Sequence, residues 1–367
     1  MFTIIIGTRP EAIKLAPLIS LFKNNKNFKT RVVLTGQHRE LVKQVMDLFD
    51  LKEDINLNLM LVKQSLNYII SESLKQLKIE FSKNKPDLVF VQGDTNTAFA
   101  AALAAFYQEI PVAHIEAGLR TNDLFNPYPE EGNRRLISQI AKLHFAPTEI
   151  AKKNLLDSGV KENIEVTGNT VIDALLHVSK KKNLNYFDEI DWQNNKVILT
   201  TIHRRENWGK VLISIIKGLR KILNRHSDVF ILLPLHPNPV VREPLQEYLG
   251  KHPRVLLTEP LAYDEIVYAL KNCKIVLTDS GGLQEEAPAL GKPVLVIRKA
   301  TERIEAVKAG TAKVIGTNSQ NIFDETNNLL LSQSVYEKMS KAINPYGDGT
   351  ASEKILKVSL AFLNSLK

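Results

Sequence analysis

The stretch LVFVQGDTNTAFAAALAAFYQEIPVAHIEAGLRT, residues 88–121, predicts the class of fold. Residues 88–91 and 112–114 are apolar runs of the length expected for buried strands. Residues 96–107 lie between them and are rich in alanine, which predicts a helix. Two buried strands joined by a helix form a βαβ unit, in which the strands are parallel and helices cover the sheet.

The same alternation extends in both directions along the chain. In the first half, strands are predicted at 4–6, 31–34, 143–145 and 164–166, with helices at 11–24, 40–49 and 65–84. After a polar stretch at 179–195 the alternation restarts, with strands at 197–200, 229–233, 254–257, 275–278 and 294–296. We therefore expect an α/β protein with two Rossmann-like domains, each built on a parallel sheet, and a cleft between them.

The domain limits are placed where the composition of the chain changes from alternating apolar segments to a polar stretch. We place the first domain at 1–167 and the second at 168–345, with the boundary near Gly168. The breaker Pro345-Tyr346-Gly347-Asp348-Gly349 then precedes a last helix at 352–366. The residues alone assign this helix to neither domain.

The composition is that of a globular protein with a modest positive charge. Hydrophobic residues make up 44% of the 367 residues and charged residues 24%. The net charge is +8, but the cations are scattered, which favours a small anionic substrate such as a phosphate ester over nucleic acid. No apolar run approaches the length of a membrane span, and the single cysteine, Cys273, excludes an internal disulfide. We expect a cytoplasmic protein with no membrane partner.

Polar residues follow the predicted strands of the first half. Arg9 and Lys14 lie near the N-terminus of the first predicted helix, where anions are favoured. An ordinary strand-to-helix turn with surface charges is the alternative. Asp94 follows the strand at 88–91 and is either an N-cap or a functional acid beside the Glu116 segment.

Ionisable residues are concentrated in the segments 114–121 and 129–135. They bring His114, Glu116, Glu130 and Arg134 close together in the sequence, directly after a predicted strand. A packed protein core rarely contains so many charged side chains. The pattern is typical of a site that moves protons next to an anion.

A phosphate site is predicted in the second half, at Ser280-Gly281-Gly282. These residues open a helix with backbone N–H groups and no bulky side chain to block an approaching phosphate. Glu286 follows one to two turns later, within reach of a ribose hydroxyl pair. An ordinary glycine-rich helix start is the alternative. His203 and Arg303 follow other predicted strand ends.

No cofactor or metal is expected. The sequence lacks the Gly-x-Gly-x-x-Gly, Gly-x-x-x-x-Gly-Lys-Ser/Thr and Gly-x-Ser-x-Gly patterns. No spacing of His, Cys, Asp and Glu is typical of a metal site.

Taken together, the motifs resemble those of the non-hydrolysing UDP-N-acetylglucosamine 2-epimerases. The matching stretches, in chain order, are GTRPEAIKLAPL (7–18), TGQHRE (35–40), QGDTNT (92–97), HIEAGLRT (114–121), PEEGNRR (129–135), TGNTVIDAL (167–175), TIHRREN (201–207), HPNP (236–239), DSGGLQEEAPALGKPVLV (279–296) and TER (301–303). The resemblance implies a GT-B glycosyltransferase-like fold, a catalytic domain at 1–167, a UDP-binding domain at 168–345 and a last segment, 346–367, that crosses back to the first domain. It also implies a homodimer and no metal or redox cofactor.

The resemblance also implies roles for single residues. The family's catalytic residues are matched by Asp94, Glu116, Glu130, Arg134 and His203. Its contacts to UDP and the sugar are matched by Arg9, Lys14, His203, Ser280, Gly281, Gly282, Glu286 and Arg303.

Two further features distinguish branches of the family. Gln37 and His38 match a site at which a second substrate molecule activates some bacterial members, although Glu40 and Lys63 depart from that site. A hydrolysing branch has a His-x-x-Gly-Gly pattern where this chain has His-x-x-Ala-Gly with Glu116 inside it. That difference favours the non-hydrolysing branch.

The resemblance thus implies interconversion of UDP-N-acetylglucosamine and UDP-N-acetylmannosamine for cell-surface polysaccharide precursors. Three alternatives remain open. The first is the same reaction on a 6-deoxy or uronic acid derivative of the UDP-sugar. The second is a glycosyltransferase of the same fold, and the third is a non-enzymatic UDP-sugar sensor.

Overall fold

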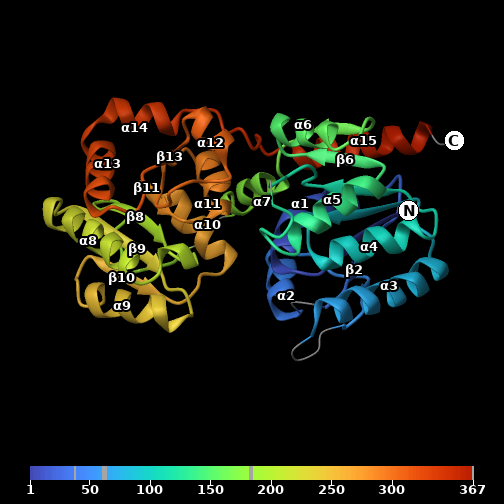
Figure 1. Cartoon of the computed structure of the whole chain (residues 1–367), viewed down its shortest axis with the longest axis horizontal. Helices are drawn as coiled ribbons and strands as arrows, with labels where there is room; N and C mark the ends of the chain where they lie inside the picture. Colours follow the sequence, from blue (N-terminus) through green and yellow to red (C-terminus); the bar gives the residue numbers. More distant parts are fainter. Residues whose placement is uncertain (37–38, 60–63, 122, 182–184, 366–367) are drawn as a thin grey trace. The chain divides into compact units, whose positions relative to one another are not determined.

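The computed structural model describes every residue except 37–38, 60–63, 122, 182–184 and 366–367. The chain forms two compact units (Figure 1). Unit 1 consists of Met1–Ala174 and Tyr346–Lys367, and unit 2 consists of Leu175–Pro345. The chain passes from unit 1 to unit 2 inside helix α7 (Thr170–Ser179) and returns between Pro345 and Tyr346.

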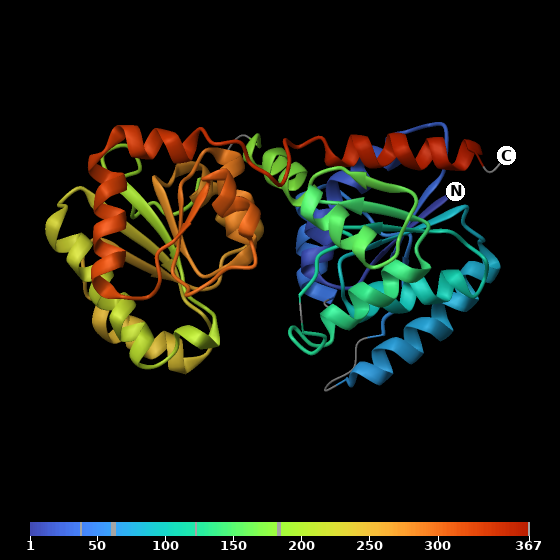
Figure 2. The ribbon, with the colours of Figure 1, turned by 45° about the horizontal axis from the view of Figure 1, so that its top comes forward.

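Unit 1 is built on a parallel sheet of order β3-β2-β1-β4-β5-β6-β7. Its strands are β1 (Phe2–Ile6), β2 (Thr30–Leu34), β3 (Ile55–Asn56), β4 (Leu88–Gln92), β5 (Val112–Ile115), β6 (Leu143–Ala146) and β7 (Ile164–Val166). Its helices are α1 (Arg9–Lys23), α2 (Arg39–Leu48), α3 (Leu66–Lys83), α4 (Asn96–Phe106), α5 (Glu130–Ile140), α6 (Glu149–Asp157), the first half of α7, and α15 (Ala351–Ser365). Helix α15, the red C-terminal helix of Figure 2, packs on α1.

Unit 2 repeats the plan with the parallel order β10-β9-β8-β11-β12-β13. Its strands are β8 (Lys196–Thr201), β9 (Val229–Pro234), β10 (Val255–Thr258), β11 (Ile275–Thr278), β12 (Val294–Val296) and β13 (Ala312–Val314). Its α-helices are α8 (Lys210–Arg225), α9 (Pro239–Leu249), α10 (Tyr263–Asn272), α11 (Gly281–Glu286), α12 (Ile304–Ala309), α13 (Ser319–Leu331) and α14 (Gln333–Ser340), with 3₁₀ turns η1 (Arg205–Asn207) and η2 (Ala287–Leu290).

The apolar runs become the cores of the two sheets. All five residues of β1 and all five of β4 are buried, as expected for parallel strands covered on both faces. The predicted pair of parallel-sheet α/β units is therefore confirmed. The sequence patterns missed β3 and β13, which are short and, in β13, interrupted by Lys313. None of the described helices is long and apolar enough to cross a membrane.

Candidate functional site

In each unit the predicted site residues gather where the strand order reverses. In unit 1 the chain continues from β1 to its neighbour β2 on one side and from β4 to its neighbour β5 on the other side. In unit 2 it continues from β8 to β9 on one side and from β11 to β12 on the other. Loops that leave two adjacent parallel strands in opposite directions leave a crevice at the carboxyl edge, where ligands bind in such folds. Asp94 follows β4, and Ser280 follows β11.

Glu116 is the centre of the unit 1 site. It is buried, and its carboxylate accepts hydrogen bonds from Lys14 Nζ at 2.6 and 2.5 Å. Asn169 Nδ2 donates to Glu116 Oε1 at 3.0 Å, and Gln92 Nε2 donates to Oε2. A buried carboxylate is stable when it is paired with a cation and hydrogen-bonded in this way.

The backbone at Glu116 is unusual. Its φ angle is +62°, in the left-handed region that non-glycine residues rarely adopt. Such a conformation costs on the order of 1–3 kcal/mol and is concentrated at functional sites. The preceding strand and the following Gly118, whose φ is +91°, hold the turn in place.

Asp94 and Arg134 form an ion pair of 2.5 Å. Arg134 is oriented by Glu131, which is fully buried and accepts from Arg134 Nη1 at 3.3 Å and from Arg135 Nε at 2.8 Å. Glu131 also accepts from the backbone N–H of Thr121 at 3.1 Å, which ties the two motif segments together. The structure therefore brings Asp94 and Arg134 together.

Glu130 begins helix α5. Its Oε2 atom is buried and has no hydrogen-bond partner among the residues that the structure describes. Helix α5 is fixed against the loop after β4, because Asn133 Nδ2 donates to Asp94 O at 2.8 Å and to Asn96 Oδ1 at 3.0 Å. A buried carboxylate oxygen without a protein partner is available to accept from, or give a proton to, a bound molecule.

His114 does not belong to the proton-moving set that its place in the motif suggested. The side chain is fully buried, and its Nε2 donates to Gly93 O at 2.7 Å. Burial lowers the pKa of His114 to about 3, although the hydrogen bond to Gly93 acts in the opposite direction. The ring is therefore neutral at pH 7 and supports the turn after β4.

The start of helix α1 holds a carboxylate of the chain itself. Glu11 is buried and accepts from the backbone N–H groups of Gly7 and Thr8 at 2.8 and 2.6 Å and from Thr95 Oγ1 at 2.5 Å. Burial raises the pKa of Glu11, and these hydrogen bonds oppose the rise. The two backbone amides directly before the helix, at the place expected to favour an external anion, are thus already bonded to a carboxylate of the chain. Arg9 begins this helix, and Lys14 lies against Glu116.

In unit 2, Asp279 organises the turn after β8. It is fully buried and accepts from the backbone N–H groups of His203 and Arg204, both at 2.9 Å, and from Asn207 Nδ2 at 3.0 Å. His203 Nδ1 lies 2.6 Å from Asp279 Oδ1, and 44% of the histidine side chain is exposed. Burial alone would raise the pKa of Asp279, but the bonds and charge of His203 and the Arg204 amide hold it below its usual range. The contact with Asp279 thus orients a partly exposed imidazole ring.

The predicted phosphate residues lie together at the start of α11. A Cβ added at Gly281 would lie 3.3 Å from Arg303 Nη2, and one at Gly282 would lie 3.5 Å from Glu286 Oε2 and 3.9 Å from Ser280 Oγ. Glu286 is buried and accepts from Tyr263 OH at 3.1 Å. The four residues that the sequence indicated here therefore form one cluster, and Arg303 lies against it.

Three arginines border this cluster and share one acid. Glu302 accepts from Arg204 Nη2 at 2.9 Å and from Arg298 Nη1 at 2.6 Å, and it lies 3.5 Å from Arg303 Nη1. Burial alone would raise the pKa of Glu302, but a backbone hydrogen bond and these arginines lower it to about 2. Arg303 Nε also donates to Glu285 Oε1 at 2.5 Å. The cations are thus held rigidly by carboxylates.

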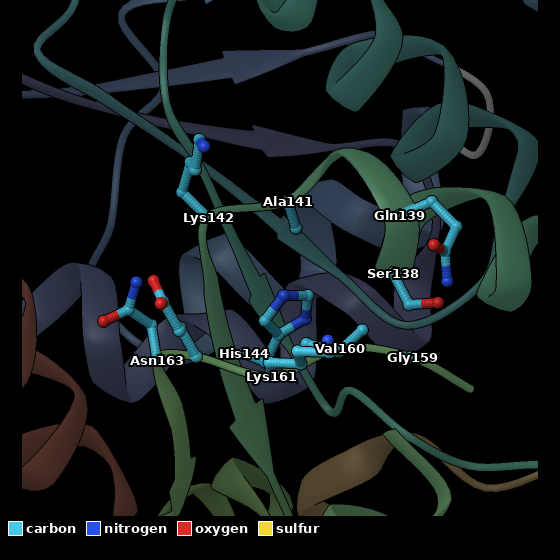
Figure 3. A pocket seen from close by; sticks show the side chains of 10 residues that line it. Ser138, Gln139, Ala141, Lys142, His144, Gly159, Val160, Lys161 and Asn163 are labelled. Atoms are coloured by element: carbon cyan, nitrogen blue, oxygen red, sulfur yellow. The ribbon is translucent and has the colours of Figure 1, made fainter. Parts of the chain in front are cut away.

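A cavity of about 280 Å³ lies at the opposite edge of the unit 1 sheet (Figure 3). It is lined by the turns before β6 and β7, so it lies at the amino ends of these strands, away from Glu116. His144 lines it, and burial lowers the pKa of that histidine to about 4. The cavity contains none of the predicted site residues.

Some site residues were missed by sequence reasoning. Gln92, Asn169, Glu131 and Asp279 all stand inside the quoted motifs, but only the fold shows which partner each one meets. Gln37 and His38, the predicted allosteric pair, lie outside the described residues. Across the described ranges, no group of three or more His, Cys, Asp and Glu side chains is arranged to hold a metal ion.

Comparisons with known proteins give the context for this geometry. Residues 21–359 match the family model described as UDP-N-acetylglucosamine 2-epimerase. The UDP-N-acetylglucosamine 2-epimerase of Campylobacter jejuni is 46% identical over 99% of this chain and 98% of its own. The crystal structure of the Neisseria meningitidis UDP-GlcNAc 2-epimerase bound to UDP-GlcNAc is 46% identical, with a TM-score of 0.89 over 98% of this chain and 99% of that one.

A more distant likeness concerns the fold alone. The crystal structure of a glycosyltransferase from Rickettsia africae superposes with a TM-score of 0.64 over 97% of each chain, at 14% identity. The two-unit architecture is thus shared with a glycosyltransferase, as expected. The match over nearly the whole chain, with relatives at 46% identity, shows that this chain belongs to the UDP-N-acetylglucosamine 2-epimerase family.

Proposed function

We propose that this chain is a non-hydrolysing UDP-N-acetylglucosamine 2-epimerase, which interconverts UDP-N-acetylglucosamine and UDP-N-acetylmannosamine. The observation that carries the proposal is Glu116. It is a buried carboxylate in a left-handed backbone conformation, paired with Lys14 at the carboxyl edge of the sheet. Family membership makes the UDP-sugar the natural substrate, and the related Neisseria enzyme binds UDP-GlcNAc.

The chemistry requires acids and a held leaving group. The hydrogen at C2 of the sugar is barely acidic, so its removal is coupled to the loss of UDP from C1. A carboxylate takes the C2 proton, the C1–O bond to UDP breaks, and a C1–C2 double bond forms, which gives 2-acetamidoglucal. UDP then adds back to C1 while a second acid delivers a proton to the opposite face of C2.

Unit 1 supplies the candidates for proton transfer in this proposal. Asp94, Glu116 and Glu130 are three carboxylates with different partners, which suits a division into acid and base. Lys14 is hydrogen-bonded to Glu116, and Arg134 is paired with Asp94. Arg9, at the start of α1, is proposed to contact the diphosphate of UDP.

Unit 2 supplies the groups that hold UDP. Ser280, Gly281 and Gly282 are proposed to present backbone N–H groups to the diphosphate, and Glu286 is proposed to accept from the ribose. His203 and Arg303 are proposed to stabilise the negative charge that develops on the departing UDP. Their rigid support by Asp279 and Glu285 suits preorganised stabilisation of this kind.

The broader setting is part of the same proposal. We infer a cytoplasmic homodimer that serves cell-surface polysaccharide synthesis, and we assign catalysis to the first domain and UDP binding to the second. Exposed apolar side chains on α3 (Ile79), at the end of α4 (Phe106), directly after it (Tyr107) and on α5 (Leu136) are proposed to take part in self-association. Equilibrium sedimentation tests the dimer.

The decisive experiment uses pure protein, UDP-N-acetylglucosamine and deuterated water, with no sugar acceptor. The expected product is UDP-N-acetylmannosamine carrying deuterium at C2, detected by NMR. Absence of this product refutes the proposal. Faster turnover of a 6-deoxy or uronic acid analogue would identify a modified substrate, and reaction only with an acceptor would identify a transferase.

Glu116→Gln separates chemistry from binding. The variant keeps the size of the side chain but cannot take a proton, so deuterium incorporation at C2 should fall by about 100-fold or more. UDP binding, measured by calorimetry, should stay within a few-fold, because most of the proposed UDP contacts lie in unit 2 and the substitution removes neither of those in unit 1, Arg9 and Lys14. A large loss of UDP affinity would contradict the role assigned to Glu116.

A further inference from the structure

The segments that lead to and from the two crossings between the units meet in one small contact in unit 1. Gly168 and Gly347 pack against each other, because a Cβ added at Gly168 would lie 3.2 Å from Gly347 Cα. Both glycines have positive φ angles, +88° and +121°. Directly beside them, the backbone N–H of Asn169 donates to Tyr346 O at 2.7 Å. The outgoing and the returning segment are therefore joined at Asn169.

The side chain of Asn169 points from this junction to the proposed catalytic carboxylate. It is 3% exposed. Its Oδ1 accepts from the backbone N–H of Val171 at 3.1 Å, which caps the crossing helix α7. Its Nδ2 donates to Glu116 Oε1 at 3.0 Å. One buried amide thus connects the crossing helix, the returning segment and Glu116.

We propose that Asn169 is a positioning residue that couples both crossings between the units to the orientation and ionisation of Glu116. The inference rests on the proposed function. A change in backbone geometry at either crossing moves the amide, and the amide contributes one of the donors that hold the carboxylate. The Lys14 ammonium from α1 and the Gln92 amide from β4 also donate to Glu116, and His114 in β5 interacts with it electrostatically. A substitution at Asn169 alters none of these three residues.

The two functions of the amide can be separated by substitution. Asn169→Ser retains an N-cap oxygen for Val171 but lacks the donor to Glu116. Asn169→Asp also retains the cap, and it replaces the donor by a second carboxylate. Both variants keep the backbone bond to Tyr346. Asn318→Asp is the matched control, because Asn318 caps helix α13 in unit 2 through the backbone N–H groups of Gln320 and Asn321.

The assay is steady-state epimerisation of UDP-N-acetylglucosamine between pH 5 and 9, after circular dichroism has verified folding. For Asn169→Ser we expect kcat to fall about 10-fold, while KM stays within about threefold of the wild-type value. We also expect the acid limb of the plot of kcat against pH to move to higher pH by about 0.5–1 unit, because a carboxylate has lost a hydrogen-bond donor. Asn169→Asp should move the limb further in the same direction. Asn318→Asp should match the wild type within about twofold.

The outcomes separate this inference from the function on which it rests. If the wild type forms no UDP-N-acetylmannosamine, the proposed function fails. If the wild type is active and Asn169→Ser keeps its kcat and pH profile, the positioning role is overturned. A loss that appears only in KM, with an unmoved acid limb, overturns it as well. If Asn169→Asp does not fold, the serine variant alone decides.

Discussion

Replacing Asp279 by asparagine is expected to destabilise unit 2, because this carboxylate holds the turn after β8 from inside the protein. Its Oδ2 atom accepts from His203 N, Arg204 N and Asn207 Nδ2. An asparagine must place its oxygen there to keep the three bonds. Its amide group then lies where Oδ1 was, 2.6 Å from His203 Nδ1.

The magnitude follows from the change in the three retained bonds. A hydrogen bond to a charged acceptor contributes about 1.5–3 kcal/mol and a neutral one about 0.5–1.5 kcal/mol, so each bond loses about 1 kcal/mol. We assign nothing to the ion pair with His203, because that side chain is largely exposed and screened by solvent. The expected loss in the free energy of unfolding is about 2–4 kcal/mol.

Tryptophan fluorescence during urea unfolding is the suitable assay. The chain has two tryptophans, Trp192 and Trp208, and both belong to unit 2. Trp208 directly follows the η1 turn that Asp279 holds through Asn207. Asp324→Asn is the matched control, since Asp324 lies exposed on α13 and accepts from Gln320. That control should change the stability by less than about 0.5 kcal/mol.

The pH dependence of the free energy of unfolding provides a second test with the same variant. The pKa of Asp279 is held below its usual range in the folded protein, so its contribution is complete above the unfolded value of about 3.9 and is lost as the pH falls through the folded value. The difference between wild type and Asp279→Asn should therefore shrink at acid pH. A loss at pH 7 no larger than that of Asp324→Asn would refute the reasoning.

Two predictions concern the stability of unit 1, followed by circular dichroism. Gly118→Ala should cost at least about 2 kcal/mol more than Gly159→Ala. Both glycines have φ near +90°, but an added Cβ would lie 2.2 Å from Ala151 O at Gly118 and would meet no described heavy atom within 4 Å at Gly159. Equal losses of stability in the two variants would show that backbone strain at positive φ, and not the contact of the added Cβ with Ala151 O, determines the effect. Separately, burial lowers the pKa values of His114 and His144 to about 3 and about 4. Between pH 7 and 5 the unfolded chain takes up protons that these folded rings do not, so stability should fall by about 2 kcal/mol per histidine. His144→Gln should remove about half of that fall, and an unchanged fall would contradict the assignment.

Much of the fold could be predicted because parallel strands buried on both faces need continuous apolar runs, which are visible in one dimension. The strand at 275–278 and the strand at 294–296 were predicted with their observed bounds. Strand β3 could not be found in this way, because a two-residue strand, Ile55–Asn56, has too few residues to form a pattern. Its position is decided by pairing with β2.

The candidate site also has a part that could be predicted from the sequence and a part that could not. Asp94 in unit 1 and Ser280 in unit 2 each stand at a strand end. The topology of a parallel sheet brings the strand ends of that one sheet together, so the grouping of site residues within each unit followed from the order of elements. Charged partners far apart in sequence did not follow. Nothing in the sequence pattern distinguishes Glu11 at the start of α1 or Glu131 in α5 from the charged residues next to them, yet both are buried.

The sequence by itself determined the two α/β units, the edge of each sheet that carries the polar residues, and the family. Those properties depend on local periodicity and on motifs. Only the tertiary structure decided that Lys14 pairs with Glu116 across 102 positions and that Asn169 donates to the same carboxylate. It also decided that His114 is neutral and structural. The physical reason is that burial and hydrogen bonding set the charge state of a side chain, and both depend on neighbours that the chain brings together only when it folds.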